Sequence, residues 1–237
     1  MSPRPVTSSV VFWDFDGTLA RRDDLWAGAL LDALTVVDPK ANVTLDRLRP
    51  GLSTGFPWHT PDEVVDARTP DGWWWSLRPT FLAAYHGAGV HPSTARAAAD
   101  RVREEFYRQD AWELIDGSLE ALSTTRSAGY RNVILSNHGP ELPQLVEALG
   151  LADFVDLTIT SAAVGAEKPN PRIFEFALAK VGVHAHSDVW MVGDNPIADV
   201  EGAERLGIRA ILADGAGPGS RGRTVLSAAE HIASESE

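Results

Sequence analysis

The chain has 237 residues and a formal net charge of −12, from 21 Lys and Arg against 33 Asp and Glu. This balance argues against general binding of nucleic acid or anionic membranes, both of which favour a basic face. It does not exclude a small anionic substrate, because a metal ion and one lysine can reverse the field locally. The absence of cysteine excludes disulfides, thiolate nucleophiles and cysteine-ligated zinc, and it fits a reducing cytoplasm.

No targeting or membrane-spanning signal is visible. Residues 1–9 lack the apolar centre of a signal peptide. The longest mostly apolar stretch, Leu25 to Val37, is too short to span a bilayer and carries Asp32. We therefore expect a soluble, cytoplasmic protein. A chain of this length buries roughly 70% of its unfolded surface and suits one large domain or a domain with an insert.

In chain order, the first predicted element is a strand at Val10–Trp13, which runs directly into Asp14 and Asp16. Four consecutive apolar residues are typical of a strand buried on both faces, as in parallel sheets. Gly17 permits a sharp turn after this strand. The two carboxylates therefore lie just past the carboxyl end of a buried strand, where open α/β sheets place their ligands. The alternative is that both are solvated turn residues.

The next stretch, residues 20–112, is predicted to be helical. After a charged turn, Asp23 or Asp24 caps a helix that ends near Val37. Residues 50–72 are rich in Pro and Gly and predict a loop with short helical pieces. Two further helices are predicted at 72–86 and 92–109, the second of them rich in the strong helix formers Ala, Arg and Glu.

Strands and helices alternate in the second half of the chain. Like the first strand, three apolar runs each lead to polar residues: 132–135 to Ser136 and Asn137, 154–160 to Lys168, and 188–192 to Asp194. Helices are predicted at 118–128, 140–149, 171–181, 196–206 and 224–233, with a further strand at 208–212. This alternation implies an α/β fold, a Rossmann-like parallel sheet with right-handed crossovers. We predict a core domain of residues 1–19 and 113–237 and an inserted α-helical cap domain at 20–112.

In such a sheet the ends of the parallel strands meet at one edge. The residues that gather there are Asp14, Asp16, Ser136, Lys168, Asp194 and Asp199. Paired acids beside an amine and a set of oxygen ligands for Mg²⁺ suit phosphoryl transfer, in which a carboxylate attacks phosphorus.

These residues also carry a resemblance to a known family. The sequence resembles the haloacid dehalogenase (HAD) superfamily of hydrolases in four motifs, in order: Asp14-Phe15-Asp16-Gly17-Thr18-Leu19, Ser136-Asn137, Lys168-Pro169, and Gly193-Asp194 through Asp199. The resemblance covers residues 9–19 and about 115–215. It implies a HAD-like core with a helical cap between the first and second motifs.

The resemblance also implies catalytic roles. Asp14 is expected to be the nucleophile that forms an aspartyl-phosphate intermediate, and Asp16 the general acid and base. Mg²⁺ is expected to bind Asp14, the backbone carbonyl of Asp16, and Asp194. Asp199 is expected to orient a metal-bound water or Lys168. The groups expected to hold the phosphoryl oxygens belong to Gly17, Thr18, Ser136, Asn137 and Lys168.

An acid at Asp16 favours an oxygen leaving group, because departing chloride needs no proton. We therefore predict a Mg²⁺-dependent phosphatase that hydrolyses phosphomonoesters of a small metabolite and binds neither nucleic acid nor membrane. The alternatives are a sugar phosphomutase, a haloacid hydrolase, a phosphonate hydrolase that uses Lys40, and a non-catalytic phosphate-binding module. A nucleotide-dependent oxidoreductase is disfavoured, because no G-x-G-x-x-G follows the first strand.

Three further signals stay open at this stage. His138 either faces the pocket or bonds to nearby backbone. The segment Phe56–His59 either reaches the sheet edge as a specificity loop or packs at a hinge. Of Trp73, Trp74 and Trp75, at least one must face a groove, a partner or the seam between cap and core, since successive helical residues rotate by about 100°. A homodimer contact, if the protein forms one, is expected at this tryptophan-rich cap.

Overall fold

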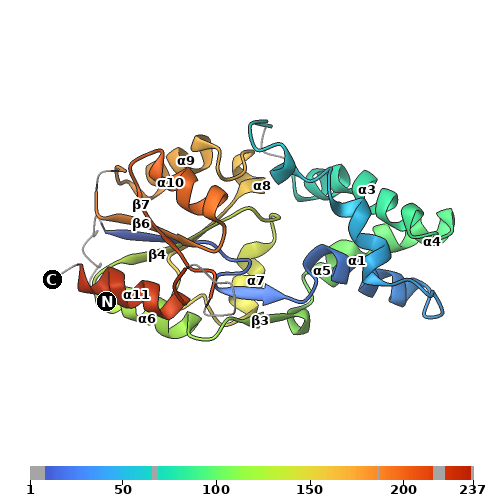
Figure 1. The fold of residues 1–237 in the computed structure, drawn as a ribbon, viewed down its shortest axis with the longest axis horizontal. Helices are drawn as coiled ribbons and strands as arrows, with labels where there is room; N and C mark the ends of the chain where they lie inside the picture. Colours follow the sequence, from blue (N-terminus) through green and yellow to red (C-terminus); the bar gives the residue numbers. More distant parts are fainter. Residues whose placement is uncertain (1–8, 66–68, 186, 216–221, 236–237) are drawn as a thin grey trace.

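The first predicted strand, β1 (Val10–Trp13), lies in the middle of a five-stranded sheet (Figure 1). The structure is a computed structural model and describes residues 9–65, 69–185, 187–215 and 222–235. The strand order is β5-β4-β1-β6-β7, with β4 (Arg131–Ser136), β5 (Leu157–Thr160), β6 (Val189–Gly193) and β7 (Arg209–Leu212). Every neighbouring pair is parallel, so the predicted α/β fold class is confirmed. The carboxyl ends of these strands share one edge.

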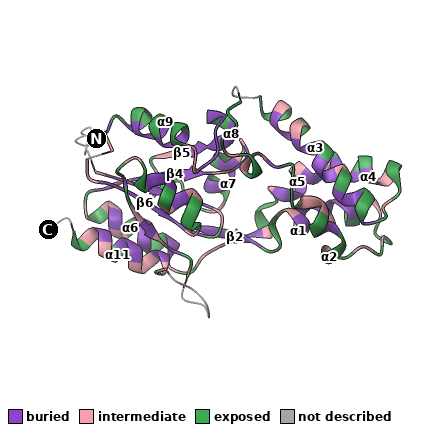
Figure 2. Ribbon diagram, turned by 45° about the horizontal axis from the view of Figure 1, so that its top comes forward, coloured by how far each residue is buried: buried purple, intermediate pink, exposed green. Residues whose placement is uncertain are grey.

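Helices cover both faces of the sheet (Figure 1). The bounds are α6 (Ser118–Ser127), α7 (Leu142–Ala148), α8 (Ser161–Val164), α9 (Pro171–Val181), α10 (Gly202–Glu204) and α11 (Val225–Ser234). In β1, Val10 and Phe12 pack in the apolar cluster that includes α9, whereas Val11 and Trp13 pack in the cluster that includes α6 and α11. All four side chains are fully buried, which explains the unbroken apolar run. Buried residues line the sheet and the inside of the helical part alike (Figure 2).

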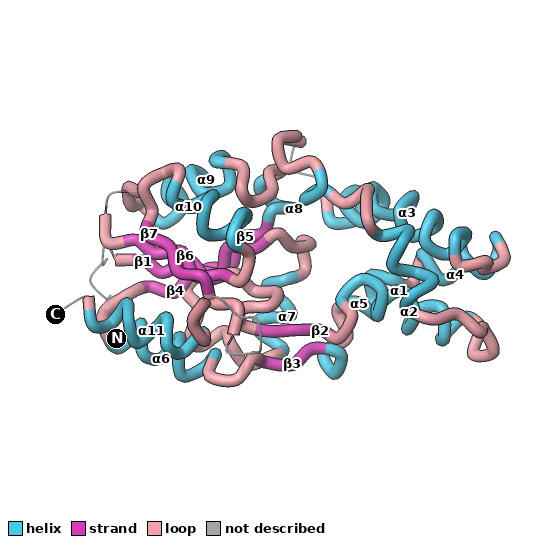
Figure 3. Tube along the Cα trace, viewed as in Figure 1, coloured by secondary structure: helices cyan, strands magenta, loops and turns pink. Residues whose placement is uncertain are grey.

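A separate group of helices projects from one end of the sheet (Figure 3). They are α1 (Leu25–Val37), α2 (Leu45–Leu48), α3 (Pro70–Gly87), α4 (Pro92–Ala99) and α5 (Val102–Phe106). Short 3₁₀ turns lie at Arg49–Leu52, Pro57–His59 and Gln109–Ala111. We call the region from α1 to α5 the helical lobe.

A two-stranded ribbon joins the helical lobe to the sheet. Strand β2 (Ala20–Arg22) pairs antiparallel with β3 (Trp112–Leu114), and Arg21 forms a cross-strand ion pair with Glu113 at 2.6 Å. The sequence analysis expects a charged turn where the structure has β2. Three-residue strands that pair across the whole lobe leave no local sequence pattern, so this strand could not be predicted. The ribbon lies at both predicted boundaries of the helical insert. The division of the chain into two domains stays a prediction.

Two local predictions are wrong, and a third, the helix at 196–206, is helical but differs in type. The helix expected at 92–109 is two helices, since the amide of Arg101 bonds to the carbonyl of Ala98, three residues back, at 3.0 Å. Asp24 precedes α1 but does not cap it, because its carboxylate pairs with Arg49 at 2.6 Å. Residues 196–206 form a π-helical segment, Pro196–Glu201, followed by the short α10.

Of the glycine-rich stretch after β7, residues 216–221 lie outside the described part of the chain. Among the described residues, no helix combines the length and the hydropathy needed to cross a bilayer.

Candidate active site

The carboxyl edge of the sheet brings the predicted acids together. Asp14 follows β1 directly, and its amide donates to the carbonyl of Val192 in β6 at 2.8 Å, so it stays in register with that strand. Asp194 follows β6 in the same way. A cleft of about 480 Å³ opens over this edge. The predicted residues that line it are Asp14, Asp16, Ser136, Asn137, Lys168, Asp194 and Asp199.

Three of these acids could hold a metal ion. Carboxylate oxygens of Asp14, Asp194 and Asp199 lie within 4.8 Å of one another. Burial, together with the charges of Asp14 and Asp199, raises the pKa of Asp194 to about 7. Gly17 makes this spacing possible, because a Cβ at that position would lie 2.3 Å from Asp194 Oδ2. Clustered negative charge among hard oxygen donors fits a divalent cation. The Asp16 carbonyl as a further ligand stays a prediction.

Lys168 supplies the positive charge of the cleft. Its Nζ donates to Asp14 Oδ1 at 2.8 Å and to Asp199 Oδ1 at 2.5 Å. Burial alone would lower the pKa of Lys168, but the charges of the two aspartates raise it overall, so the ammonium stays charged. Asp199 therefore holds Lys168, one of the two roles expected for it. Burial also raises the pKa of Asp199, to about 6, against the opposing charge of Lys168.

Asn137 positions this lysine. Its Nδ2 donates to the carbonyl of Lys168 at 2.9 Å, and its Oδ1 accepts from the amide of Lys168 at 2.6 Å. Both ends of the carboxamide are therefore used in fixing the Lys168 backbone. Asn137 also lines the cleft, so its backbone N–H and the second Nδ2–H are the donors that it can still offer to a substrate.

Asp16 stands apart from this network. Its Oδ1 is buried and has no hydrogen-bond partner within the described residues. Burial, followed by the charges of Asp14 and Asp194, raises the pKa of Asp16 well above its usual value. His138 Nε2 lies 3.7 Å from this oxygen, and His138 Nδ1 lies 2.9 Å from the hydroxyl of Tyr107 in the helical lobe. His138 therefore lies beside Asp16 but does not line the cleft, and its Nδ1 also lies 3.3 Å from the carbonyl of Gly139, so each of the two alternatives is met in part. Burial lowers the pKa of His138 to about 4, which keeps the ring neutral at pH 7.

The expected phosphate-binding groups divide into two sets. The Ser136 hydroxyl is buried at the cleft without a hydrogen-bond partner in the described chain, so it is open to a ligand. Gly17 and Thr18 are a correction: their amides donate to the carbonyls of Ala20 (2.9 Å) and Phe15 (3.3 Å), and neither residue lines the cleft. The tight turn after β1 uses these donors internally. The amide of Asp16, which does line the cleft, has no backbone acceptor among the described residues, and sequence reasoning did not single it out.

A family model described as haloacid dehalogenase-like hydrolase matches residues 9–207 of the chain. The chain belongs to this family. The mouse haloacid dehalogenase-like hydrolase domain-containing protein 3 is 32% identical over 150 residues, which cover 61% of this chain and 57% of that protein. Phosphoserine phosphatase of Thermus thermophilus is 39% identical over 137 residues, 56% of this chain and 53% of that one. The matches thus span a little over half the length of these relatives.

Solved structures share the fold of this chain. A HAD phosphatase from Thermococcus onnurineus has a TM-score of 0.61 at 21% identity, with 94% of this chain and 97% of that chain covered. A 2-haloacid dehalogenase from Pseudomonas syringae has a TM-score of 0.63 at 24% identity, with 96% and 98% covered. The HAD fold therefore occurs in both a phosphatase and a dehalogenase, so the fold alone does not separate the two chemistries.

The helical lobe contributes residues to the cleft that the sequence left open or missed. Trp58 lines it, as the specificity-loop alternative for Phe56–His59 expects, and Leu25 and Trp26 of α1 line it as well. Periodicity within α1 could not reveal this, because its first turn looks like any apolar helix face.

The three consecutive tryptophans of α3 do not share one face of the helix, as the rotation between successive helical residues requires. Trp73 and Trp74 are buried, and the Trp74 Nε1–H donates to Glu141 of the core at 3.0 Å, at the seam between lobe and core. Trp75 is 71% exposed. The homodimer contact expected at this tryptophan-rich region stays a prediction. Lys40 is exposed and does not line the cleft, so it is not placed for phosphonate chemistry.

Proposed function

We propose that this HAD-family hydrolase is a Mg²⁺-dependent phosphatase that hydrolyses phosphomonoesters of a small metabolite. The observation that carries the proposal is the carboxyl group of Asp16, two residues after Asp14, which lies at the cleft and has a buried oxygen without a partner among the described residues. An oxygen leaving group needs a proton donor at this place, whereas a halide does not. The phosphatase names of two relatives support the same reaction class.

Asp14 acts as the nucleophile. Its Oδ1 is held by Lys168, which leaves its second carboxylate oxygen to attack phosphorus. The new bond joins that oxygen to phosphorus while the bond from phosphorus to the ester oxygen breaks. The product is an aspartyl phosphate on Asp14 and a free alcohol, so one difficult displacement becomes two easier ones.

Asp16 moves the proton in both steps. In the first step its carboxyl group donates a proton to the departing ester oxygen, and its raised pKa favours the protonated form that this step needs. In the second step the resulting carboxylate takes a proton from water as that water attacks the aspartyl phosphate. Phosphate leaves, and Asp14 and Asp16 return to their starting forms.

Charge around the phosphoryl group is balanced by fixed groups. Lys168 lies at the cleft with a permanent ammonium, and the Ser136 hydroxyl is free to donate to a phosphoryl oxygen. Asp14 and Asp194 would hold Mg²⁺, which when bound offsets the repulsion between the acids and the incoming phosphate.

Hydrolysis of p-nitrophenyl phosphate tests the proposal. Turnover should require Mg²⁺, stop with a chelator, and fall by roughly 10³-fold or more in Asp14→Asn. Asp153→Asn, at an exposed position of the core, is the matched control and should keep full activity. Turnover that survives the chelator or Asp14→Asn would overturn the mechanism. Phosphate binding without any turnover would instead favour a non-catalytic binding module, and chloride release from a haloacid would favour a dehalogenase.

A further inference from the structure

The walls of the cleft have two different chemistries. Its floor, at the sheet edge, is charged and holds the groups that handle the phosphoryl group. Its upper walls are apolar: Leu25, Trp26, Trp58 and Pro61 come from the region between β2 and α3, and Pro169, Ile197 and Ala198 from the core. Leu25 is 37% exposed and Ile197 is 56% exposed, so large apolar side chains are left open to whatever enters. Open apolar surface at a cleft is typical of a ligand contact.

The two tryptophans of this wall are held rigidly. Trp26 stacks on Phe106 with ring centroids 4.2 Å apart and planes at 19°. Trp58 stacks on Phe56 at 4.4 Å and 11°, and the Trp26 and Trp58 rings are 5.8 Å apart. A ring that enters the cleft therefore meets an aromatic surface whose conformation is already fixed, which lowers the entropy lost on binding.

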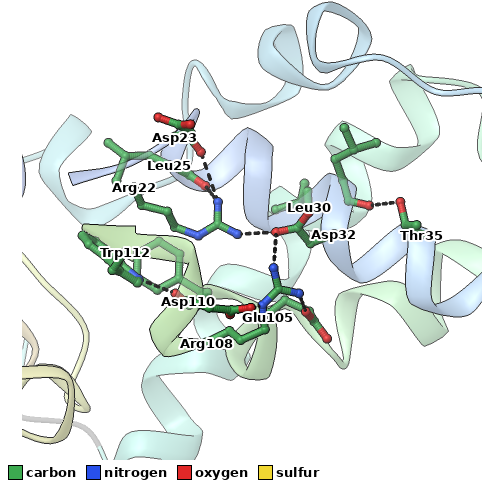
Figure 4. Close-up of polar contacts among 12 residues, drawn as sticks. Arg22, Asp23, Leu25, Leu30, Asp32, Thr35, Glu105, Arg108, Asp110 and Trp112 are labelled. Atoms are coloured by element: carbon green, nitrogen blue, oxygen red, sulfur yellow. Dashed lines mark hydrogen bonds and ion pairs between the residues drawn. The ribbon is translucent and has the colours of Figure 1, made fainter. Parts of the chain in front are cut away.

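A strained backbone turn at Asp24 and Leu25 positions part of this apolar wall. Asp24 and Leu25 have φ values of +56° and +38°, a left-handed conformation that is unfavourable for residues with a Cβ. Arg22 holds them there: its Nη1 donates to the carbonyls of Asp23 (3.2 Å) and Leu25 (3.1 Å), and its Nη2 pairs with Asp32 at 2.6 Å (Figure 4). This strained turn places Leu25 and Trp26 at the mouth of the cleft.

Charge further restricts what the apolar wall can accept. Among the described lining residues, Lys168 is the one cation, and it is already paired with Asp14 and Asp199. A carboxylate or second phosphate on the leaving group would find no unpaired cation among the described residues that line the cleft. Desolvation without a partner disfavours such a group.

We propose that the substrate is a phosphomonoester of an uncharged alcohol that carries a flat apolar ring, with the ring packed against Trp26 and Trp58. This inference rests on the proposed phosphatase function and specifies the substrate class of the same cleft. Trp58 acts as a specificity residue, because it lies on the loop Pro57–His59 and contacts the alcohol portion rather than the reacting atoms.

Two alkyl esters with similar leaving groups test the proposal, 2-phenylethyl phosphate and O-phosphoserine. With Mg²⁺, kcat/KM should favour 2-phenylethyl phosphate by roughly tenfold or more. Trp58→Ala should reduce that kcat/KM by roughly tenfold, chiefly through KM. Trp75→Ala is the matched control, since Trp75 is exposed and does not line the cleft. Calorimetry with the non-hydrolysable 2-phenylethylphosphonate should show the same loss of affinity in Trp58→Ala and none in Trp75→Ala.

The two layers of the proposal fail in different ways. If phosphonate binding depends on Trp58 but no ester is hydrolysed, the phosphatase function is wrong and the ring-binding wall stands. If esters are hydrolysed with equal or better kcat/KM for phosphoserine, or if Trp58→Ala leaves KM for the phenylethyl ester unchanged, the substrate class is overturned.

Discussion

The sheet edge and the helical lobe differ in the partners that their side chains find within the protein. At the sheet edge, Asp14, Asp194 and Asp199 crowd together, and Ser136 and Asp16 keep buried oxygens without partners in the described chain. At the base of the lobe, by contrast, Nη1 and Nη2 of Arg22 reach two carbonyls and a carboxylate, although its Nε has no partner within the described residues, and the aromatic rings of the lobe stack on one another. The edge thus holds reactive groups at some expense of stability, while the lobe supplies stability and an apolar surface.

The largest effect is expected at the sheet edge, where a substitution of Asp16 tests whether activity and stability oppose each other. Asp16→Asn removes the proton donor, so kcat for a phosphomonoester should fall by roughly 10²- to 10⁴-fold. The same change removes a carboxyl group whose ionisation is disfavoured by burial and by neighbouring acids, and whose Oδ1 lacks a hydrogen bond within the described residues. The free energy of unfolding should therefore rise by about 1 kcal/mol when measured in denaturant without Mg²⁺.

The control for this prediction is Asp153→Asn, which should change neither quantity. A variant that loses both activity and stability would show that Asp16 is a structural residue, and the contrast between the two regions would fail there.

The sequence predicted the edge far better than the lobe, and the reason is physical. A buried parallel strand needs an unbroken apolar run, and the turn after it needs polar residues, so Val10–Trp13 followed by Asp14 is legible locally. Asp194 obeys the same rule after β6, whereas Lys168 follows β5 only after the short helix α8. The sequence could not show which backbone N–H groups remain available to a ligand. The amides of Gly17 and Thr18 donate to carbonyls within the turn itself, and this is visible only in the structure.

The lobe depends on partners far apart in the chain. Asp24 looks like a helix cap, yet Arg49 takes its carboxylate, and the pairing of β2 with β3 spans the whole insert. Trp26 reaches the cleft because the strained turn at Asp24 and Leu25 positions it there, and Trp58 is held at the cleft by stacking on Phe56. None of these arrangements follows from periodicity, because each is decided by tertiary contacts.

Two adjacent arginines of β2 offer a smaller and more specific test of the lobe. The Arg22 side chain is 3% exposed, whereas that of Arg21 is 62% exposed in a surface pair with Glu113. Arg22→Ala should lower the free energy of unfolding by roughly 3 kcal/mol, because two carbonyls and Asp32 lose their donor. Arg21→Ala should leave the denaturation midpoint unchanged, since exposed pairs contribute little. Equal losses in the two variants would mean that the polar network of Arg22 does not support the lobe.

The smallest effect is expected from removing a tyrosine hydroxyl, either at Tyr85 or at Tyr107. The comparison of the two variants separates an effect on stability from an effect on activity. The Tyr85 hydroxyl donates to the carbonyl of Leu30 inside the lobe at 2.7 Å, and the Tyr107 hydroxyl lies 2.9 Å from His138, whose other nitrogen faces Asp16. Each Tyr→Phe substitution should cost about 1 kcal/mol of unfolding free energy for one lost hydrogen bond. Only Tyr107→Phe should also lower kcat, by roughly tenfold or less, because His138 then orients less firmly beside Asp16. Steady-state kinetics on both variants decide the point: a kcat that is unchanged in Tyr107→Phe, or lowered equally in Tyr85→Phe, would mean that the lobe touches the chemistry through its apolar wall alone.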